Sequence, residues 1–180
     1  FTYSTAGIAV YQNTSVNSLS FTLASPLLLN SVSGINIYVS PMDLPAFTDV
    51  DYDGDIDILT FDSFGWFVNY FKNTSIENYG NCDSLIYEST TGCWGNFYEG
   101  LNTYILDCYN CQCPPITNGS SSKKGVHAGS SLLAIDVDGD NDKDLILGDV
   151  SYNNLNLLIN GGDNQNAHII SVDTAFPQNY

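Results

Sequence analysis

The sequence predicts an all-β fold of short antiparallel strands. Short apolar runs rich in Tyr, Phe, Val and Ile alternate with connections rich in Asn, Ser, Thr and Gly. Two Asp-rich segments, residues 49–57 and 136–144, each separate a pair of such runs. Runs of this length and composition, bounded by turn-forming residues, are typical of strands rather than helices.

The first acidic segment, residues 49–57, has an Asp at every odd position and Gly54 near its middle. Carboxylates this close repel one another, and Ca²⁺ accepts six to eight oxygen ligands in loose geometry. Gly54 permits a positive-φ turn around an ion. An EF-hand would need Glu at the twelfth position, where Thr60 stands. The segment therefore predicts a calcium loop between two strands, with a solvated acidic turn as the alternative.

The second acidic segment, residues 136–144, repeats the odd-position pattern 87 residues later. Asn141 replaces the central glycine, and Asn is one of the few other residues that tolerate the left-handed conformation. This recurrence weakens the interpretation as an ordinary acidic turn, and we expect two Ca²⁺ sites. The candidate metal residues are Asp49, Asp51, Asp53, Asp55 and Asp57 in the first loop, and Asp136, Asp138, Asp140, Asp142 and Asp144 in the second.

The sequence around each loop also repeats. Asn73 follows Asp49 by 24 residues, and Asn160 follows Asp136 by the same 24 residues without a gap. A partial third copy opens the chain, where residues 8–15 match residues 68–75 at an offset of 60. We expect the chain to begin inside one repeat and to end inside another, as a piece of a longer array.

Each repeat is expected to give four short strands. In the best-defined repeat they fall at about 45–50, 56–61, 66–72 and 84–88, and the partial copies place their fourth strands near 20–25 and 167–173. Four antiparallel strands in each repeat of 40–60 residues are typical of a β-propeller blade. The chain would supply about two blades, fewer than the four to eight that close a propeller.

The expected organisation has three parts. Residues 1–45 would form the C-terminal strands of a preceding blade and a linker. Residues 46–130 would form a blade with a calcium loop and a Cys-rich insertion at about 76–130, and residues 131–180 an incomplete next blade. Because a single blade cannot bury both of its faces, neighbouring blades of the same longer chain are expected partners.

The insertion contains all the cysteines and many aromatic residues. It forms either a small disulfide-stapled subdomain or a cover for a neighbouring apolar surface, and both interpretations stay open. Clustered cysteines favour an oxidising, extracellular compartment with at least one disulfide, against free thiols in the cytosol. Five cysteines leave one unpaired within the chain, and their connectivity cannot be deduced from sequence. The residues concerned are Cys82, Cys93, Cys108, Cys111 and Cys113, with Trp94, Phe97, Tyr98, Tyr104 and Tyr109.

The charge and hydropathy of the chain exclude two kinds of partner. A formal charge of −16, with four lysines and no arginine, argues against nucleic acid and against a polybasic membrane patch. No run of about 18 apolar residues is present, so we expect no transmembrane helix and no membrane insertion.

The two loops and their flanking strands resemble FG-GAP (also called VCBS) repeats, the calcium-binding blades found in integrin α subunits. The resemblance covers residues 46–73 and 131–161. It implies side-chain ligands at the first, third, fifth and ninth positions of each loop and a backbone carbonyl ligand at the seventh. In this sequence those positions are Asp49, Asp51, Asp53 and Asp57 with the carbonyl of Asp55, then Asp136, Asp138, Asp140 and Asp144 with the carbonyl of Asp142.

The segment at residues 127–136 is similar to segments of large secreted bacterial surface proteins, which implies an extracellular or cell-surface location. The Phe-Gly and Gly-Ala-Pro marks of the FG-GAP family are poorly kept, and only Phe64-Gly65 is suggestive. The pair of calcium loops and the aromatic, Cys-rich insertion favour a segment that acts in adhesion or in recognition of a glycan or protein ligand. The alternative is a purely structural scaffold within a larger secreted enzyme or surface filament.

An enzyme is the weakest of the functional hypotheses. No nucleophile elbow, zinc-protease motif or phosphate-binding loop is present, and His127 and His168 lie in no recognisable motif. Glycosidases hold two carboxylates on separate elements, unlike five in one loop. We expect no catalytic residue and no organic cofactor. Three Asn-x-Ser/Thr sites, at Asn13, Asn73 and Asn118, are more simply explained by turns than by glycosylation.

Overall fold

A computed structural model of the chain describes residues 1–4, 7–100, 103–108 and 130–178. In these residues the fold is all-β, as predicted, with antiparallel sheets of two to four strands, none of them closed. The first sheet contains β1 (Thr2–Ser4), β2 (Gly7–Asn13) and β3 (Phe21–Ser25). The second contains β4 (Ala46–Thr48), β5 (Asp57–Phe61), β6 (Val68–Asn73) and β7 (Tyr87–Thr91), with α1 (Ser75–Tyr79) between its last two strands.

The second half of the chain builds one more large sheet and a small hairpin. The third sheet contains β10 (Ser130–Ile135), β11 (Asp144–Asp149), β12 (Leu155–Asn160) and β13 (Ile169–Phe176). A 3₁₀ turn, η1 (Trp94–Asn96), leads from β7 into the hairpin of β8 (Tyr98–Gly100) and β9 (Thr103–Ile105). Each four-stranded sheet is a meander in which consecutive strands are neighbours.

The second and third sheets have the same strand register. Leu59 pairs with Tyr70 across β5 and β6, and Ile146 pairs with Leu157 across β11 and β12, each 87 residues further along. The same offset relates the pair Ala46 and Leu59 to the pair Leu133 and Ile146. The two acidic segments therefore connect corresponding strands at corresponding positions.

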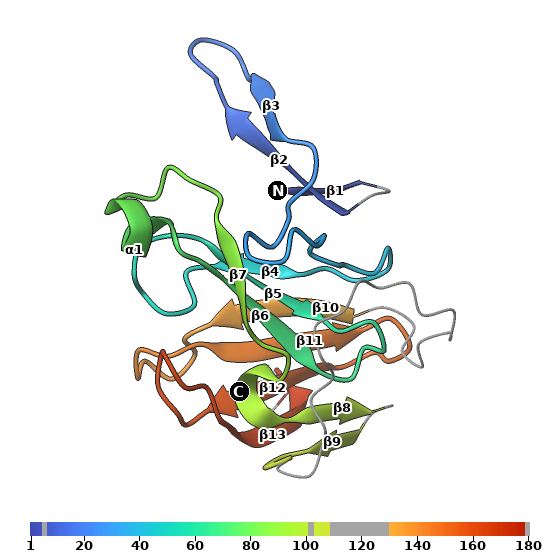
Figure 1. Ribbon diagram of the computed structural model, residues 1–180. Helices are drawn as coiled ribbons and strands as arrows, with labels where there is room; N and C mark the ends of the chain where they lie inside the picture. The colour runs from blue at the N-terminus through green and yellow to red at the C-terminus, as the bar shows by residue number, and fades with distance from the viewer. Residues whose placement is uncertain (5–6, 101–102, 109–129, 179–180) are drawn as a thin grey trace.

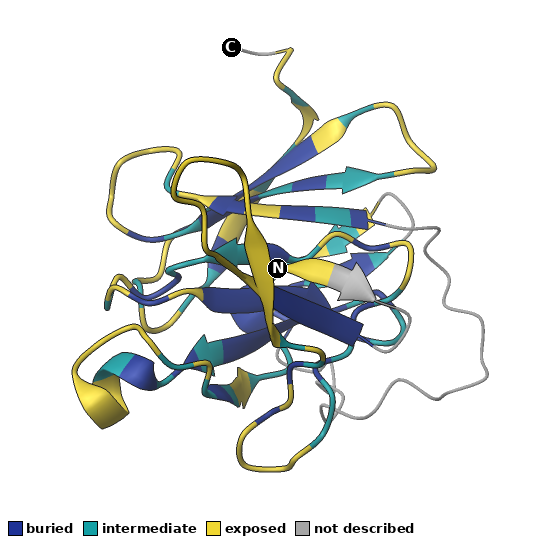
Figure 2. Cartoon of the chain, turned by 90° about the horizontal axis from the view of Figure 1, so that it is seen from above, coloured by how far each residue is buried: buried dark blue, intermediate teal, exposed yellow. Residues whose placement is uncertain are grey.

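The three large sheets lie in a stack, with the second sheet in the middle (Figure 1). One core cluster lies between the second and third sheets. It includes Leu59, Val68, Leu145 and Leu158, which are all 0% exposed. Side chains alternate between the faces of a strand, so the other face of the second sheet packs on the first sheet through Ile58, Phe71 and Tyr87. Buried strands consequently run through the middle of the molecule and exposed loops surround them (Figure 2).

The second and third sheets also meet at their first strands. Leu44, just before β4, donates its N–H to the carbonyl of Ser130 at 2.9 Å, and its own carbonyl accepts the N–H of Leu132 at 2.9 Å. These bonds form a short parallel bridge, so β4 and β10 lie side by side.

The aromatic insertion covers the core between the second and third sheets. Trp94 is 5% exposed and Phe97 is 0% exposed, and both belong to that core cluster. Cys93 and Cys108 each take part in a disulfide bond, and Cys82 is free, in line with the expectation of at least one disulfide and one unpaired cysteine. Cys111, Cys113 and Tyr109 lie outside the described residues. The burial of Trp94 and Phe97 agrees with the cover interpretation, and the fourth strand expected near 84–88 is β7.

Candidate metal centre

Loop 1, residues 49–56, joins β4 to β5, and loop 2, residues 136–143, joins β10 to β11. In each loop two residues take positive φ at corresponding positions. In loop 1 these are Tyr52 at 61° and Gly54 at 106°, and in loop 2 they are Gly139 at 84° and Asn141 at 71°. The expected turns at Gly54 and Asn141 are confirmed. Both loops lie at the same side of the stack, together with α1 (Figure 1).

The last Asp of each segment fixes its loop to the sheet. Both oxygens of Asp57 accept backbone N–H groups, Oδ2 from Val50 at 2.9 Å and Oδ1 from Asn73 at 2.8 Å. Asp144 accepts the corresponding N–H groups of Val137 and Asn160, both at 2.8 Å. Since Asp57 and Asp144 are both 0% exposed, these bonds hold each loop closed against the next hairpin.

Two further hydrogen bonds shape each loop internally. The N–H of Gly54 donates to Asp49 Oδ2 at 3.1 Å, and the N–H of Asn141 donates to Asp136 Oδ2 at 3.1 Å. The aspartates at positions five and seven of the segment are also joined, because Asp53 Oδ1 accepts the N–H of Asp55 at 3.1 Å and Asp140 does the same for Asp142. The four bonds of loop 1 therefore all recur in loop 2.

The loops bring several of the predicted ligands together. One carboxylate oxygen from each of Asp49, Asp51 and Asp53 lies within 4.8 Å of the others, and Asp136, Asp138 and Asp144 converge in the same way. A further group joins Asp53 and Asp55 to Glu77 of α1. The predicted residues Asp57, Asp140 and Asp142 belong to none of these three groups.

Several buried carboxylate oxygens of the loops have no hydrogen-bond partner and could coordinate a cation. In loop 1 they are Oδ1 of Asp49, Asp51 and Asp55 and Oδ2 of Asp53. Two of these four residues are almost fully buried, Asp51 at 5% exposed and Asp55 at 1% exposed. In loop 2 both oxygens of Asp142 are without a partner, and this residue is 2% exposed. A buried carboxylate oxygen without a donor is unfavourable. Because the donor set contains only hard oxygens, the residues present fit Ca²⁺.

The electrostatics of the loops favour the same conclusion. Burial raises the pKa of Asp57 to about 7, against the opposing effect of its two N–H donors. Burial and the carboxylates of Asp140, Asp144 and Asp138 raise the pKa of Asp142 to about 6. Burial also raises the pKa values of Asp49, Asp55 and Asp144. The loops thus resist carrying their full negative charge, and a bound divalent cation would remove that resistance.

Lys72 and Glu77 complete loop 1, although neither belongs to the acidic segment. Lys72 Nζ pairs with Asp51 and Glu77 and lies 3.1 Å from Asp53 Oδ2. Burial opposes the charge of Asp53, but the N–H of Asp55 and the Lys72 ammonium together lower its pKa. Sequence reasoning missed both residues, because Lys72 sits on β6 and Glu77 on α1, more than twenty positions from the start of the loop.

Loop 1 also contacts the third sheet. Lys143 Nζ of loop 2 lies 3.8 Å from the centre of the Tyr52 ring, a cation–π contact. Asn164, in the β12–β13 turn, donates its side-chain N–H to the carbonyl of Asp51 at 2.9 Å. The two candidate metal sites are therefore neighbours in one acidic surface.

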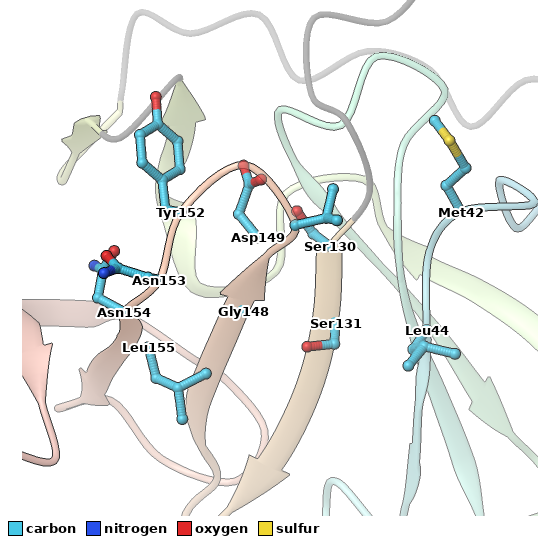
Figure 3. A pocket seen from close by; sticks show the side chains of 11 residues that line it. Met42, Leu44, Ser130, Ser131, Gly148, Asp149, Tyr152, Asn153, Asn154 and Leu155 are labelled. Atoms are coloured by element: carbon cyan, nitrogen blue, oxygen red, sulfur yellow. The ribbon is translucent and has the colours of Figure 1, made fainter.

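A cavity of about 460 Å³ lies at the other end of β10 and β11, where Ser130 pairs with Asp149. Met42 and Leu44 form one side of it, and Asp149 and Tyr152, at and just after the end of β11, form the other (Figure 3). A carboxylate, side-chain amides, a phenol and apolar side chains thus surround one hollow. Its complete lining is Met42, Leu44, Ser130, Ser131, Gly148, Asp149, Val150, Tyr152, Asn153, Asn154 and Leu155.

A buried polar chain connects the aromatic insertion to the third sheet near this cavity. Asn156 donates its side-chain N–H to the Tyr104 hydroxyl at 2.7 Å, and that hydroxyl hydrogen-bonds Glu99. Glu99 is 5% exposed. Burial, followed by the carboxylates of Asp149 and Asp43, raises the pKa of Glu99 to about 8 from its ordinary value of 4.5.

Replacing Glu99 by Gln is expected to remove a pH dependence of stability. A raised folded-state pKa means that the neutral carboxyl stabilises the fold fully below about pH 4.5, and that this contribution is lost as the pH rises to about 8. Urea unfolding in excess Ca²⁺ should give E99Q and the wild type similar free energies at pH 5. At pH 8.5 E99Q should be more stable by roughly a few kcal/mol. A constant difference between the two across this range would contradict the expectation.

Asn residues at the ends of β2, β6 and β12 close turns. Asn13 Oδ1 accepts the N–H of Ser15 at 2.9 Å, Asn73 Oδ1 that of Ser75 at 3.3 Å, and Asn160 Oδ1 that of Gly162 at 3.0 Å. The turn role expected for Asn13 and Asn73 is confirmed, and Asn118 lies outside the described residues.

His168, just before β13, has its Nε2 2.5 Å from Asp107 Oδ1, and His127 lies outside the described residues.

Comparison of the chain with protein-family models, with curated proteins and with solved structures finds no match. Within the residues that the structure describes, neither α1 nor any other helical segment has the length and apolar character needed to cross a bilayer.

Proposed function

We propose that the chain is a calcium-binding segment of a β-propeller in a secreted or cell-surface protein, and that it acts in adhesion or in recognition of a glycan or protein ligand. The observation that carries this proposal is the pair of acidic loops. They connect corresponding strands, repeat the same four hydrogen bonds and contain buried carboxylate oxygens without a partner. Asp49, Asp51 and Asp53, and Asp136, Asp138 and Asp144, would hold the two ions.

The stacking of the sheets supports the propeller part of the proposal. Blades of a propeller pack face to face with their first strands neighbouring one another, as β4 and β10 do. The outer faces of the stack carry exposed apolar side chains, including Tyr11 and Leu23 on the first sheet and Leu133 and Ile170 on the third. Such faces fit further blades of the same longer chain as partners.

Two observations support the extracellular and recognition parts of the proposal. Cys93 and Cys108 each take part in a disulfide bond, which is typical of oxidising compartments. The cavity at the ends of β10 and β11 combines Asp149, Tyr152 and the Asn153 and Asn154 amides. Carboxylates and amides that can bond hydroxyl groups, beside an aromatic ring, suit a sugar.

A scaffold without a ligand of its own is the second candidate. The exposed apolar outer faces favour it, because they are explained by packing between repeats alone. In that case calcium would stabilise the fold, and the cavity at Asp149 and Tyr152 would bind no ligand.

Glycan-array binding of the protein in millimolar Ca²⁺ and in EGTA tests recognition. We expect calcium-dependent retention of a defined set of glycans. The variants Y152A and D149N should weaken it about tenfold or more, because each removes a contact group from the cavity. An exposed site outside the cavity, Tyr79→Ala, serves as the control. Calcium stabilisation without any glycan or protein binding would favour the scaffold.

A further inference from the structure

A positive charge from β6 already lies beside the carboxylates of loop 1. The Lys72 ammonium pairs with Asp51 and Glu77 and lies 3.1 Å from Asp53 Oδ2, so three carboxylates surround it. Two of these carboxylates, those of Asp51 and Asp53, also belong to the group that converges with Asp49. The lysine side chain is only 20% exposed, which keeps the ammonium beside the loop.

Among the residues that the structure describes, no ammonium pairs with the carboxylates of loop 2, although the two loops share the four hydrogen bonds described above. Ile159 stands 87 residues after Lys72, on the strand that corresponds to β6, and Asn164 stands 87 residues after Glu77. In the described structure Lys143 of loop 2 lies on the Tyr52 ring. Both oxygens of Asp142 are buried without a hydrogen-bond partner, whereas in loop 1 the corresponding Asp55 keeps one oxygen bonded to the N–H of Ile76 at 3.1 Å.

We propose that Lys72 is a tethered competitor of calcium in loop 1, so that loop 2 fills at a lower Ca²⁺ concentration than loop 1. The proposal rests on the calcium-binding function proposed above. An ion held by Asp49, Asp51 and Asp53 needs two carboxylates that the ammonium neutralises, and two cations a few ångströms apart repel each other strongly in a partly buried site.

When Ca²⁺ displaces the Lys72 ammonium from the loop, the ammonium can stay paired with Glu77. The Glu77 side chain is 43% exposed and pairs with the same ammonium from α1, outside the loop. Lys72 can therefore release Asp51 and Asp53 while keeping one partner. Oδ1 of Asp51, buried and without a hydrogen-bond partner, is an oxygen that the ammonium does not satisfy and that an ion would. The Lys72 ammonium therefore stabilises loop 1 without calcium, and loop 1 binds Ca²⁺ only at a higher concentration than loop 2.

Chelator-competition titrations with Ca²⁺ alone test this difference in variants that retain one loop. D138N removes a converging ligand of loop 2 and leaves loop 1, whereas D49N leaves loop 2 and spares the partners of Lys72. Adding K72I, which copies the residue of the other repeat, should tighten Ca²⁺ binding at least tenfold in the D138N background. In the D49N background it should change affinity by less than about twofold. K143M removes the same charge from the Tyr52 ring and should not reproduce the gain.

K72Q repeats the test with a polar side chain, in case K72I does not fold without calcium. An unchanged or weaker loop 1 affinity in both variants, with calcium still binding to loop 2, would overturn the competitor role and leave the proposed function intact. Absence of Ca²⁺ binding at both loops of the wild type would overturn the two together. A wild type in which loop 1 fills before loop 2 would also contradict the proposal.

Discussion

Millimolar Ca²⁺ is expected to raise the unfolding temperature of the protein by about 10–20 °C relative to EGTA. A ligand at 100 times its dissociation constant adds about 2.7 kcal/mol for each site, so two loops would add about 5 kcal/mol. In a protein of this size each kcal/mol corresponds to roughly 2–4 °C. The gain is large because the ion replaces repulsion among converging carboxylates, such as Asp49, Asp51 and Asp53, with shared coordination.

Differential scanning calorimetry of single-loop variants assigns this effect to the loops. D49N and D138N should each lose part of the calcium-dependent rise, and D138N should lose the larger part, because loop 2 is the site that we expect to bind Ca²⁺ more tightly. Asp163→Asn is the matched control, because Asp163 is an exposed aspartate in the β12–β13 turn that bonds only nearby turn residues. No rise at all would identify the segments as ordinary acidic turns, and an equal rise with Mg²⁺ would contradict selectivity for calcium.

The local features of the site could be predicted because they depend on nearby residues. Alternating aspartates around Gly54 specify a tight turn of positive φ, and Asn141 substitutes for it at 71°. Recurrence at 87 residues then gave the corresponding positions of both loops. The role of Asp57 was harder to foresee, since its two oxygens accept N–H groups from Val50 and from the distant Asn73.

The contacts made across the fold could not be predicted in the same way. Lys72 contacts loop 1 and Glu77 because the β5–β6 hairpin and α1 place both residues beside the loop. A single lysine or glutamate in the sequence does not indicate such a contact. Glu99 is similar: its raised pKa comes from burial and from Asp149 and Asp43, which lie far away in the chain. Pattern reasoning gives strands and turns, whereas these charges depend on how the sheets stack.

Replacing Phe97 of the insertion by Ala is expected to destabilise the protein strongly. The burial of this residue, like the contacts of Lys72 and Glu99, depends on how the sheets stack. Phe97 is 0% exposed and packs in the core between the second and third sheets, together with Trp94, Leu145 and Ile169. Replacing it by Ala should cost about 3–5 kcal/mol, since the cavity left between two sheets cannot easily collapse. Urea unfolding in excess Ca²⁺ should show a lower midpoint with an unchanged slope. Tyr79→Ala, at a side chain 62% exposed, should change stability by less than about 0.5 kcal/mol. If the insertion were instead a separate subdomain, F97A would shift a small independent transition and leave the main one in place.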